Sequence, residues 1–181
     1  MAIKIMDIPT HYLQNIQQIF ANYKQMGERA MAQLSEAQLT QTLGEESNSI
    51  AVIVKHLRGN MLSRWTNFLT EDGEKPWRKR DGEFEADLDS REAVLAAWEE
   101  GWACLFEALS SLQEAHLQQT IYIRGEGHTV MEAINRQLTH YSYHIGQIVL
   151  LAKHCRGADW QTLSIAKGQS AQYNQQKFNA Q

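Results

Sequence analysis

The chain has 181 residues, of which 43% are hydrophobic and 21% are charged, and its formal net charge is −4 at pH 7. These values are typical of one globular domain over residues 1–181, and the acidic balance argues against a surface that binds nucleic acid or an anionic membrane. The apolar stretches fall short of the roughly 18 residues that a membrane-spanning helix needs. The N-terminus lacks the apolar core of a secretory signal, and there are two cysteines, so we expect a reduced, cytoplasmic protein.

Four amphipathic runs in the sequence predict four helices. The first begins after Pro9, with Thr10 as its expected N-cap. Segment 34–39 then predicts a turn with Leu39 directed inward. The apolar side chains of the first run recur at spacings of three, four and seven: Leu13, Ile16, Phe20, Tyr23, Ala30 and Leu34.

The second run begins at Ser47 or Asn48, both good N-caps, and ends before the turn dipeptide Asp72-Gly73. A long loop follows, in which a basic cluster over residues 75–80 lies among acidic residues. Because these charges nearly cancel, we expect a solvated segment. The apolar stripe of the second run consists of Ile50, Ile53, Val54, Leu57, Met61, Trp65 and Phe68.

The third run begins after Asp89-Ser90, and a strand-like segment, 120–123, precedes the fourth run. Glycines at 125 and 127 are suited to reverse the chain there, which predicts a short hairpin. The apolar stripe of the third run consists of Val94, Leu95, Trp98, Trp102, Leu105, Phe106, Leu109 and Leu112.

The fourth run has the clearest ends. Thr129 and Glu132 form a capping box, and Gly157 follows a basic last turn as a left-handed stop. The tail, residues 158–181, is polar and rich in glutamine, so we expect it to be irregular and either packed on the domain or partly disordered. Together these elements predict an all-α, up-and-down four-helix bundle with a long loop after the second helix and a hairpin before the fourth.

Two histidines in the fourth run, His140 and His144, lie one helical turn apart and therefore project from one side of the predicted helix. His56 lies in the second run, on a similar flank of its apolar stripe. If the two helices pack side by side, the three imidazoles meet and can bind one metal ion. The spacing alone leaves an alternative open, since histidines at the edge of a core often serve as hydrogen-bonded packing residues.

Longer segments carry a resemblance to a known family. Segments 48–61, 73–81 and 163–168, together with His140-x-x-x-His144-Ile-Gly-Gln147, are similar to the DinB-like superfamily, also called YfiT-like metal-dependent hydrolases, and to one bacterial subfamily within it. The resemblance implies a four-helix bundle that is often dimeric. It also implies one divalent metal ion, nickel or zinc, held by His56, His140 and His144.

Relatives in this superfamily include S-transferases that use bacillithiol and an isomerase that uses mycothiol. The resemblance therefore implies a metal-dependent enzyme acting on a small-molecule substrate, with a low-molecular-weight thiol as cosubstrate. The residues between the two histidines of the fourth run are Tyr, Ser and Tyr, with no carboxylate to serve as a general base for water. This favours thiol transfer over hydrolysis, because a metal ion itself lowers the pKa of a bound thiol. A hydrolase at the same site and a non-catalytic, stress-related helical dimer remain the alternatives.

Five further residues are candidates for ligand contact. Asn60 and Gln147 are expected to orient a ligand or water. Arg136 is suited to anchor an anionic cosubstrate, and the alternative for it is a solvated surface arginine. Arg78 and Arg80, with Trp77 beside them, are candidates for a substrate lid; Trp77 is equally suited to plug the end of the bundle.

Overall fold

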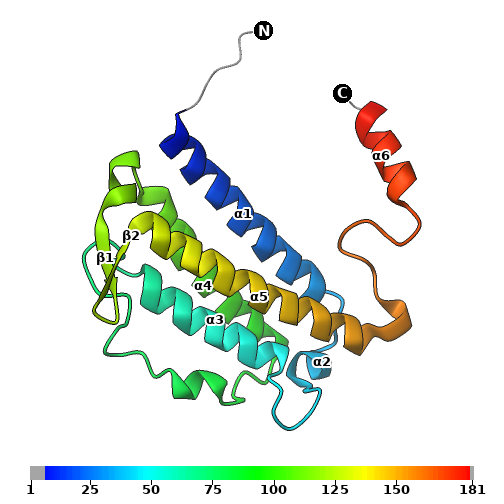
Figure 1. Ribbon diagram of the computed structural model, residues 1–181. Coiled ribbons are helices and arrows are strands. Elements are labelled where there is room, and N and C mark those ends of the chain that lie inside the picture. Colours follow the sequence, from blue (N-terminus) through cyan, green and yellow to red (C-terminus); the bar gives the residue numbers. More distant parts are fainter. Residues whose placement is uncertain (1–6, 180–181) are drawn as a thin grey trace.

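Four long helices make up most of the structure, a computed structural model that describes residues 7–179 (Figure 1). Two shorter helices, α2 (Glu36–Thr40) and α6 (Ser170–Asn179), three short 3₁₀ turns and one two-stranded sheet complete the regular structure of that range. The protein is therefore mostly helical, as the sequence predicts. The long helices are α1 (Ile8–Met31), α3 (Ile50–Trp65), α4 (Arg91–Ser111) and α5 (Val130–Arg156).

The N-caps of the first two long helices lie beside the residues that the sequence favours. The expected cap of α1, Thr10, is wrong: Asp7 caps the helix, and its carboxylate accepts a hydrogen bond from the backbone N–H of Thr10 at 3.0 Å. The cap of α3 is Ser49, while Ser47 accepts two backbone N–H groups of the preceding loop instead. Adjacent Ser, Thr and Asp are all good caps, so local sequence does not choose between them.

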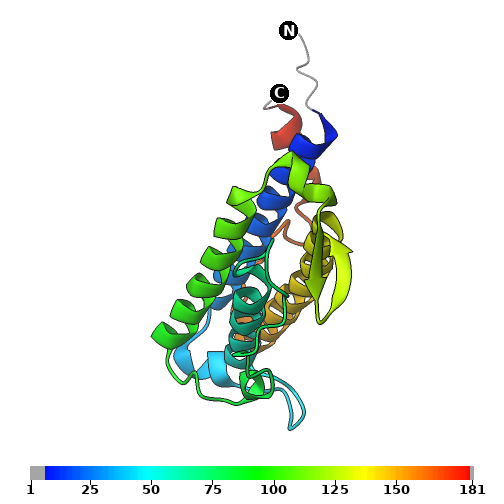
Figure 2. The same cartoon turned by 90° about the vertical axis from the view of Figure 1, so that its left-hand side faces the viewer.

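Helix α3 is one turn shorter than its apolar stripe predicts. It ends at Trp65, and Asn67 adopts a positive φ of 50°. Phe68 lies beyond the helix but is still buried, with its ring 4.7 Å from that of Trp65. From there the chain runs back along α3, so that a short 3₁₀ turn, η1 (Asp81–Phe84), packs against that helix (Figure 2).

The predicted hairpin is confirmed. Strands β1 (Thr120–Ile123) and β2 (Glu126–Thr129) pair antiparallel, and a two-residue turn joins them at Arg124 and Gly125, both with positive φ. The Asp72 carboxylate accepts hydrogen bonds from both turn N–H groups, at 2.8 and 2.7 Å. Asp72 thereby ties the hairpin to the first part of the segment that follows α3.

Helix α5 has the ends that the sequence predicts. Thr129 and Glu132 form the capping box, and Gly157 ends the helix with a φ of 56°. An aromatic cluster joins α5 to the other long helices: the fully buried ring of Tyr141 lies 5.9 Å from Phe20 of α1 and 6.0 Å from Trp102 of α4. One hydrophobic core thus lies between all four long helices.

The first part of the tail packs on the domain. Trp160 and Leu163 pack against the core. Arg29 of α1 and Gln33, which follows that helix, donate hydrogen bonds to carbonyl oxygens of the tail. Beyond them the tail contains α6, which has no buried residue and stands apart from the long helices in Figure 1. The final residues, 180–181, lie outside the described range. Across residues 7–179, no helix has the length and apolar character needed to cross a bilayer.

Two helical glycines provide a matched test of this packing. A methyl group at Gly27 of α1 would lie within 2.7 Å of two ring atoms of the buried Trp98, whereas one at Gly146 of α5 would meet nothing within 4 Å. We expect Gly27→Ala to lower the free energy of unfolding by about 1–3 kcal/mol through overpacking. Gly146→Ala is expected to raise it by about 0.5–1 kcal/mol, because alanine is the better helix former. Urea denaturation measures both, and equal effects would contradict the packing of α1 on α4.

Candidate metal centre

The packing of α3 against α5 brings three imidazoles together. His140 and His144 lie four residues apart on α5, and His56 faces them from α3. The Nε2 atom of His140 lies 3.2 Å from Nε2 of His56 and 3.2 Å from Nε2 of His144. In the described part of the chain, these three side chains form the group whose ligand atoms all lie within 4.8 Å of one another. The structure therefore places the three sequence-predicted ligands at one point.

The spacing of the nitrogens fits a shared ion. Nitrogen ligands about 2.0–2.1 Å from one divalent ion lie about 2.9–3.4 Å apart at octahedral to tetrahedral angles. The two observed separations of 3.2 Å fall within that range. Burial lowers the pKa of His140 to about 3 and that of His144 to about 4, so both rings are neutral at physiological pH and offer free lone pairs.

Hydrogen bonds at the opposite ring nitrogens fix the direction of two of these imidazoles. His56 Nδ1 lies 2.9 Å from a carboxylate oxygen of Glu83, and His144 Nδ1 lies 2.8 Å from the side-chain oxygen of Gln147. Each oxygen accepts the Nδ1 proton, which leaves the Nε2 lone pair directed at the centre. Such partners orient metal-binding histidines and raise their basicity.

Glu83 is the main site residue that sequence reasoning misses. It lies in η1, within the acidic and basic segment that predicts a solvated loop, and no periodicity marks it. In the structure Glu83 is buried, and the Arg78 guanidinium donates two hydrogen bonds to it, at 2.7 and 2.9 Å. Burial raises the pKa of the Glu83 carboxyl, but the hydrogen bonds from His56 and Arg78 outweigh that effect and hold it below its ordinary value.

The expectation of a solvated loop is thus wrong for part of this segment. The side chains of Lys75 and Arg78 are 3% and 2% exposed, because carboxylates of the same segment pair with them. Trp77 is half exposed and lies outside the lining of the cavity beside the histidines. It instead borders a separate hollow next to Arg58. In this position Trp77 neither covers the cavity as a lid nor closes the end of the helices as a plug.

A glycine makes room for the Glu83 contact. Gly59 lies three residues after His56 on α3, and a methyl group there would lie 2.6 Å from the carboxyl carbon of Glu83 and closer still to its oxygen Oε1. Such an approach requires Glu83 to move. The absence of a side chain at position 59 therefore permits the carboxylate to reach His56.

A buried hydrogen-bond chain lies behind the centre. Trp65 donates from Nε1 to the Tyr141 hydroxyl at 3.0 Å, and that hydroxyl donates to the Asn60 side-chain oxygen at 3.0 Å. Burial raises the pKa of Tyr141, which stays protonated. Because its oxygen accepts from Tyr141, Asn60 keeps its NH₂ group as the donor on the cavity side.

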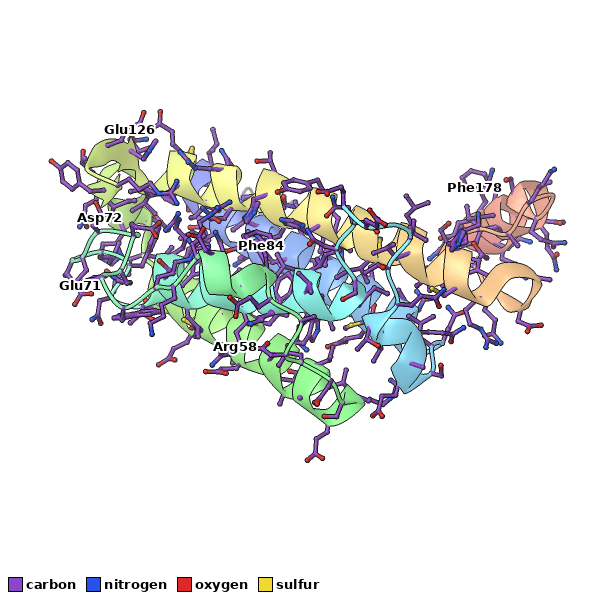
Figure 3. The ribbon with its side chains drawn as sticks, turned by 90° about the horizontal axis from the view of Figure 1, so that it is seen from below. Arg58, Glu71, Asp72, Phe84, Glu126 and Phe178 are labelled. Carbon is purple, nitrogen blue, oxygen red and sulfur yellow. The ribbon has the colours of Figure 1, made fainter. Side chains whose placement is uncertain are left out.

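The histidines form part of the wall of an open cavity of about 600 Å³. All five candidates for ligand contact line it with them: Asn60, Arg78, Arg80, Arg136 and Gln147. Two aromatic rings border the histidines: Phe84 stacks on His56 at 5.0 Å, and Tyr143 lies against His144 at 4.1 Å. Figure 3 shows Phe84 between α3 and α5.

The lining also contains residues that the sequence analysis does not single out. Arg64 follows Asn60 by four positions on α3, and Gln137 precedes His140 by three on α5, so helical spacing was the available signal for both. Arg124 comes from the hairpin turn, and no pattern in the sequence points to it.

The comparisons with known proteins identify a family. Residues 7–169 match the model of the family described as "Protein of unknown function (DUF1572)". The match covers most of the chain, and the protein belongs to this family. Neither the curated proteins nor the solved structures contain a match.

The contact between Glu83 and His56 predicts a measurable effect on metal affinity. Glu83→Gln removes the charge that orients His56, and we expect zinc to bind about 10–100-fold more weakly. Gly59→Ala displaces the same carboxylate without altering it, and a loss of similar size is expected. Competition with a chromophoric chelator measures both affinities. Glu85→Gln is the control, since Glu85 is exposed two residues away; equal zinc affinities in all three variants would contradict the role of Glu83.

Proposed function

We propose that this member of the DUF1572 family is a metal-dependent enzyme, a thiol-dependent S-transferase with a divalent metal ion at His56, His140 and His144. The observation that carries the proposal is the convergence of three imidazole Nε2 atoms in the wall of an open cavity. A purely structural ion needs a closed set of ligands, whereas a catalytic ion keeps a position for substrate. The cavity of about 600 Å³ offers that space.

The family supports the same proposal. DUF1572 is grouped in the DinB/YfiT-like clan. We accordingly propose that the four long helices form the up-and-down bundle of that clan. The histidines lie on α3 and α5, the second and fourth of the long helices, which is the distribution that the resemblance implies.

The donor set suits nickel or zinc, since neutral imidazoles bind both. When bound, such an ion supplies positive charge that lowers the pKa of a thiol or water held at the site. The protein holds the three ring nitrogens in place through Glu83 and Gln147 and keeps His140 and His144 neutral by burial. The amide of Asn60 provides a hydrogen-bond donor beside them.

The position of Glu83 favours transfer to a thiol over attack by water. A hydrolase needs a base that can take a proton from water. Glu83 contacts the centre through His56, but both of its oxygens already accept hydrogen bonds from His56 and Arg78, and its pKa lies below the ordinary value. It is therefore a positioning residue and a weak base. Hydrolysis at the same site is the second candidate, since it uses the same ligands.

Metal content tests the centre. We expect about one nickel or zinc ion per purified chain by elemental analysis, and loss of most of it in His144→Ala and His56→Ala, because two imidazoles hold an ion less tightly than three. His154→Ala is the control: His154 is exposed near the end of the same helix as His144. Metal retained in all three variants would show that the ion binds elsewhere.

Turnover tests the reaction. The metal-loaded protein is expected to accelerate the conjugation of a low-molecular-weight thiol with an electrophile such as monobromobimane, and a chelator should abolish the effect. A protein that binds metal at the three histidines and hydrolyses esters or amides without conjugating any thiol supports the hydrolase. A protein that binds metal and does neither contradicts both reactions.

A further inference from the structure

Arginines dominate the polar lining of the cavity. Five of them contribute to its wall: Arg64, Arg78, Arg80, Arg124 and Arg136. They come from α3, the segment after it, the hairpin turn and α5, so that separate parts of the chain direct positive charge to one place. Within residues 7–179, no Asp or Glu side chain lines the cavity.

The carboxylates nearby neutralise only part of this charge. Glu74 pairs with three of the arginines, Arg64 at 3.1 Å, Arg124 at 3.1 Å and Arg78 at 3.5 Å, while Glu83 pairs with Arg78. The Asp72 carboxylate also interacts electrostatically with Arg64. Five guanidinium groups thus face three carboxylates, an excess of two positive charges. Arg80 and Arg136 have no acidic partner within the described residues. An excess of this size attracts an anion.

Two buried polar atoms in the same wall have no hydrogen-bond partner in the described structure. Arg64 is 6% exposed, and its Nε is buried and unpaired; Gln137 is 4% exposed, and its side-chain oxygen is buried and unpaired. Leaving such groups without partners costs about 1–3 kcal/mol each. Other protein atoms cover both of these atoms, so each side chain must rotate slightly to meet a ligand in the cavity. A ligand that then offers an acceptor to Arg64 and a donor to Gln137 would remove that cost.

From these observations we propose that the cavity binds a small oxyanion, a carboxylate or a phosphate, that also carries a hydroxyl or N–H group. The proposed ligand is the substrate class of the proposed metal enzyme. Only the reaction that follows binding rests on the proposed function. The guanidinium groups of Arg136 and Arg64 hold the negative charge, and the Gln137 oxygen accepts the hydroxyl or N–H proton. The opposite, reacting part of the ligand lies beside the histidines, between the rings of Phe84 and Tyr143.

Calorimetric titration of the full-length chain, stripped of metal with a chelator and then dialysed free of it, tests this proposal with four probes: malonate, hydroxymalonate, inorganic phosphate and malonamide. Removing the metal excludes any contribution from direct coordination, and removing the chelator excludes competition from its own carboxylates. We expect at least one anion to bind at least ten-fold more tightly than the neutral malonamide, because a hydrogen bond between charged groups changes the binding affinity by about that factor. Tighter binding of malonate assigns a carboxylate, and tighter binding of phosphate assigns a phosphate ester. No difference between the anions and malonamide would overturn the proposal.

Matched variants test the residues. Arg136 is exposed and unpaired, so Arg136→Gln should fold normally and weaken anion binding about ten-fold. Lys153→Gln removes the same charge from the same helix about 25 Å further along and should leave binding unchanged. Equal losses in the two variants would show a general effect of net charge and overturn the site.

Gln137→Leu provides a readout that a structural role would not give. Because it removes an unpaired buried polar group, the variant should unfold at the same or a higher temperature than the wild type. It should nevertheless lose any preference for hydroxymalonate over malonate, which differs by one hydroxyl. Equal affinity of the wild type for these two probes would overturn the role of Gln137.

These outcomes separate this proposal from the proposed function. Anion binding without thiol conjugation or hydrolysis would support the proposed ligand class and contradict the proposed enzymatic function. Turnover of a substrate by a protein that binds none of the anions would support the enzymatic function and contradict the proposed ligand class.

Discussion

The register between α3 and α5 is the constraint on which the site depends. The buried chain from Trp65 through the Tyr141 hydroxyl to Asn60 crosses between these helices, and a slide of either one would leave three polar groups without partners. The packing of Tyr141 against Phe20 and Trp102 ties this register to α1 and α4. His56 lies one helical turn before Asn60, while His140 directly precedes Tyr141 and His144 follows it by three residues. The same register therefore places His56 opposite His140 and His144, so that the core determines where the three imidazoles meet.

Charge pairing in the segment after α3 positions the groups that surround the histidines. Burying Glu83 or Arg78 alone would be costly, but each is the partner of the other, and His56 and Glu74 complete the network. These contacts help to hold the segment against α3. Its carboxylates, Glu74 and Glu83, already pair with arginines, and Glu83 also orients His56. The cavity consequently retains a positive field next to the imidazoles.

This arrangement divides the cavity into two chemical environments. The imidazoles, bordered by Phe84 and Tyr143, offer a place for an ion and for the reacting part of a substrate. The arginines and Gln137 offer charge and unpaired hydrogen-bonding atoms that suit a polar, anionic group. A metal ion would add to the positive charge already present. The charge of the arginines would therefore favour an anionic ligand beside the histidines.

The sequence alone determined the features that depend on neighbours in the chain. Apolar periodicity located the four long helices, the Thr129 capping box and Gly157 gave the ends of α5, and the four-residue spacing of His140 and His144 put them on one side of it. Caps at Asp7 and Ser49 were missed by a few residues, because several adjacent side chains cap a helix equally well. Helical spacing also places Arg64 on the same side of its helix as Asn60, and Gln137 on the same side as His140, so both could have been predicted to line the site.

Only the tertiary structure decided which distant groups meet. Glu83 belongs to a stretch of mixed charge whose local composition is that of a solvated loop, and its partners are 27 and 5 residues away, at His56 and Arg78. Arg124 reaches the cavity because Asp72 holds a hairpin turn in a conformation with two positive φ angles. Helix periodicity is a local property of the backbone, whereas the partner of a charge is set by distance in space. For that reason the metal ligands could be proposed from the sequence, and the groups that orient them and charge the cavity could not.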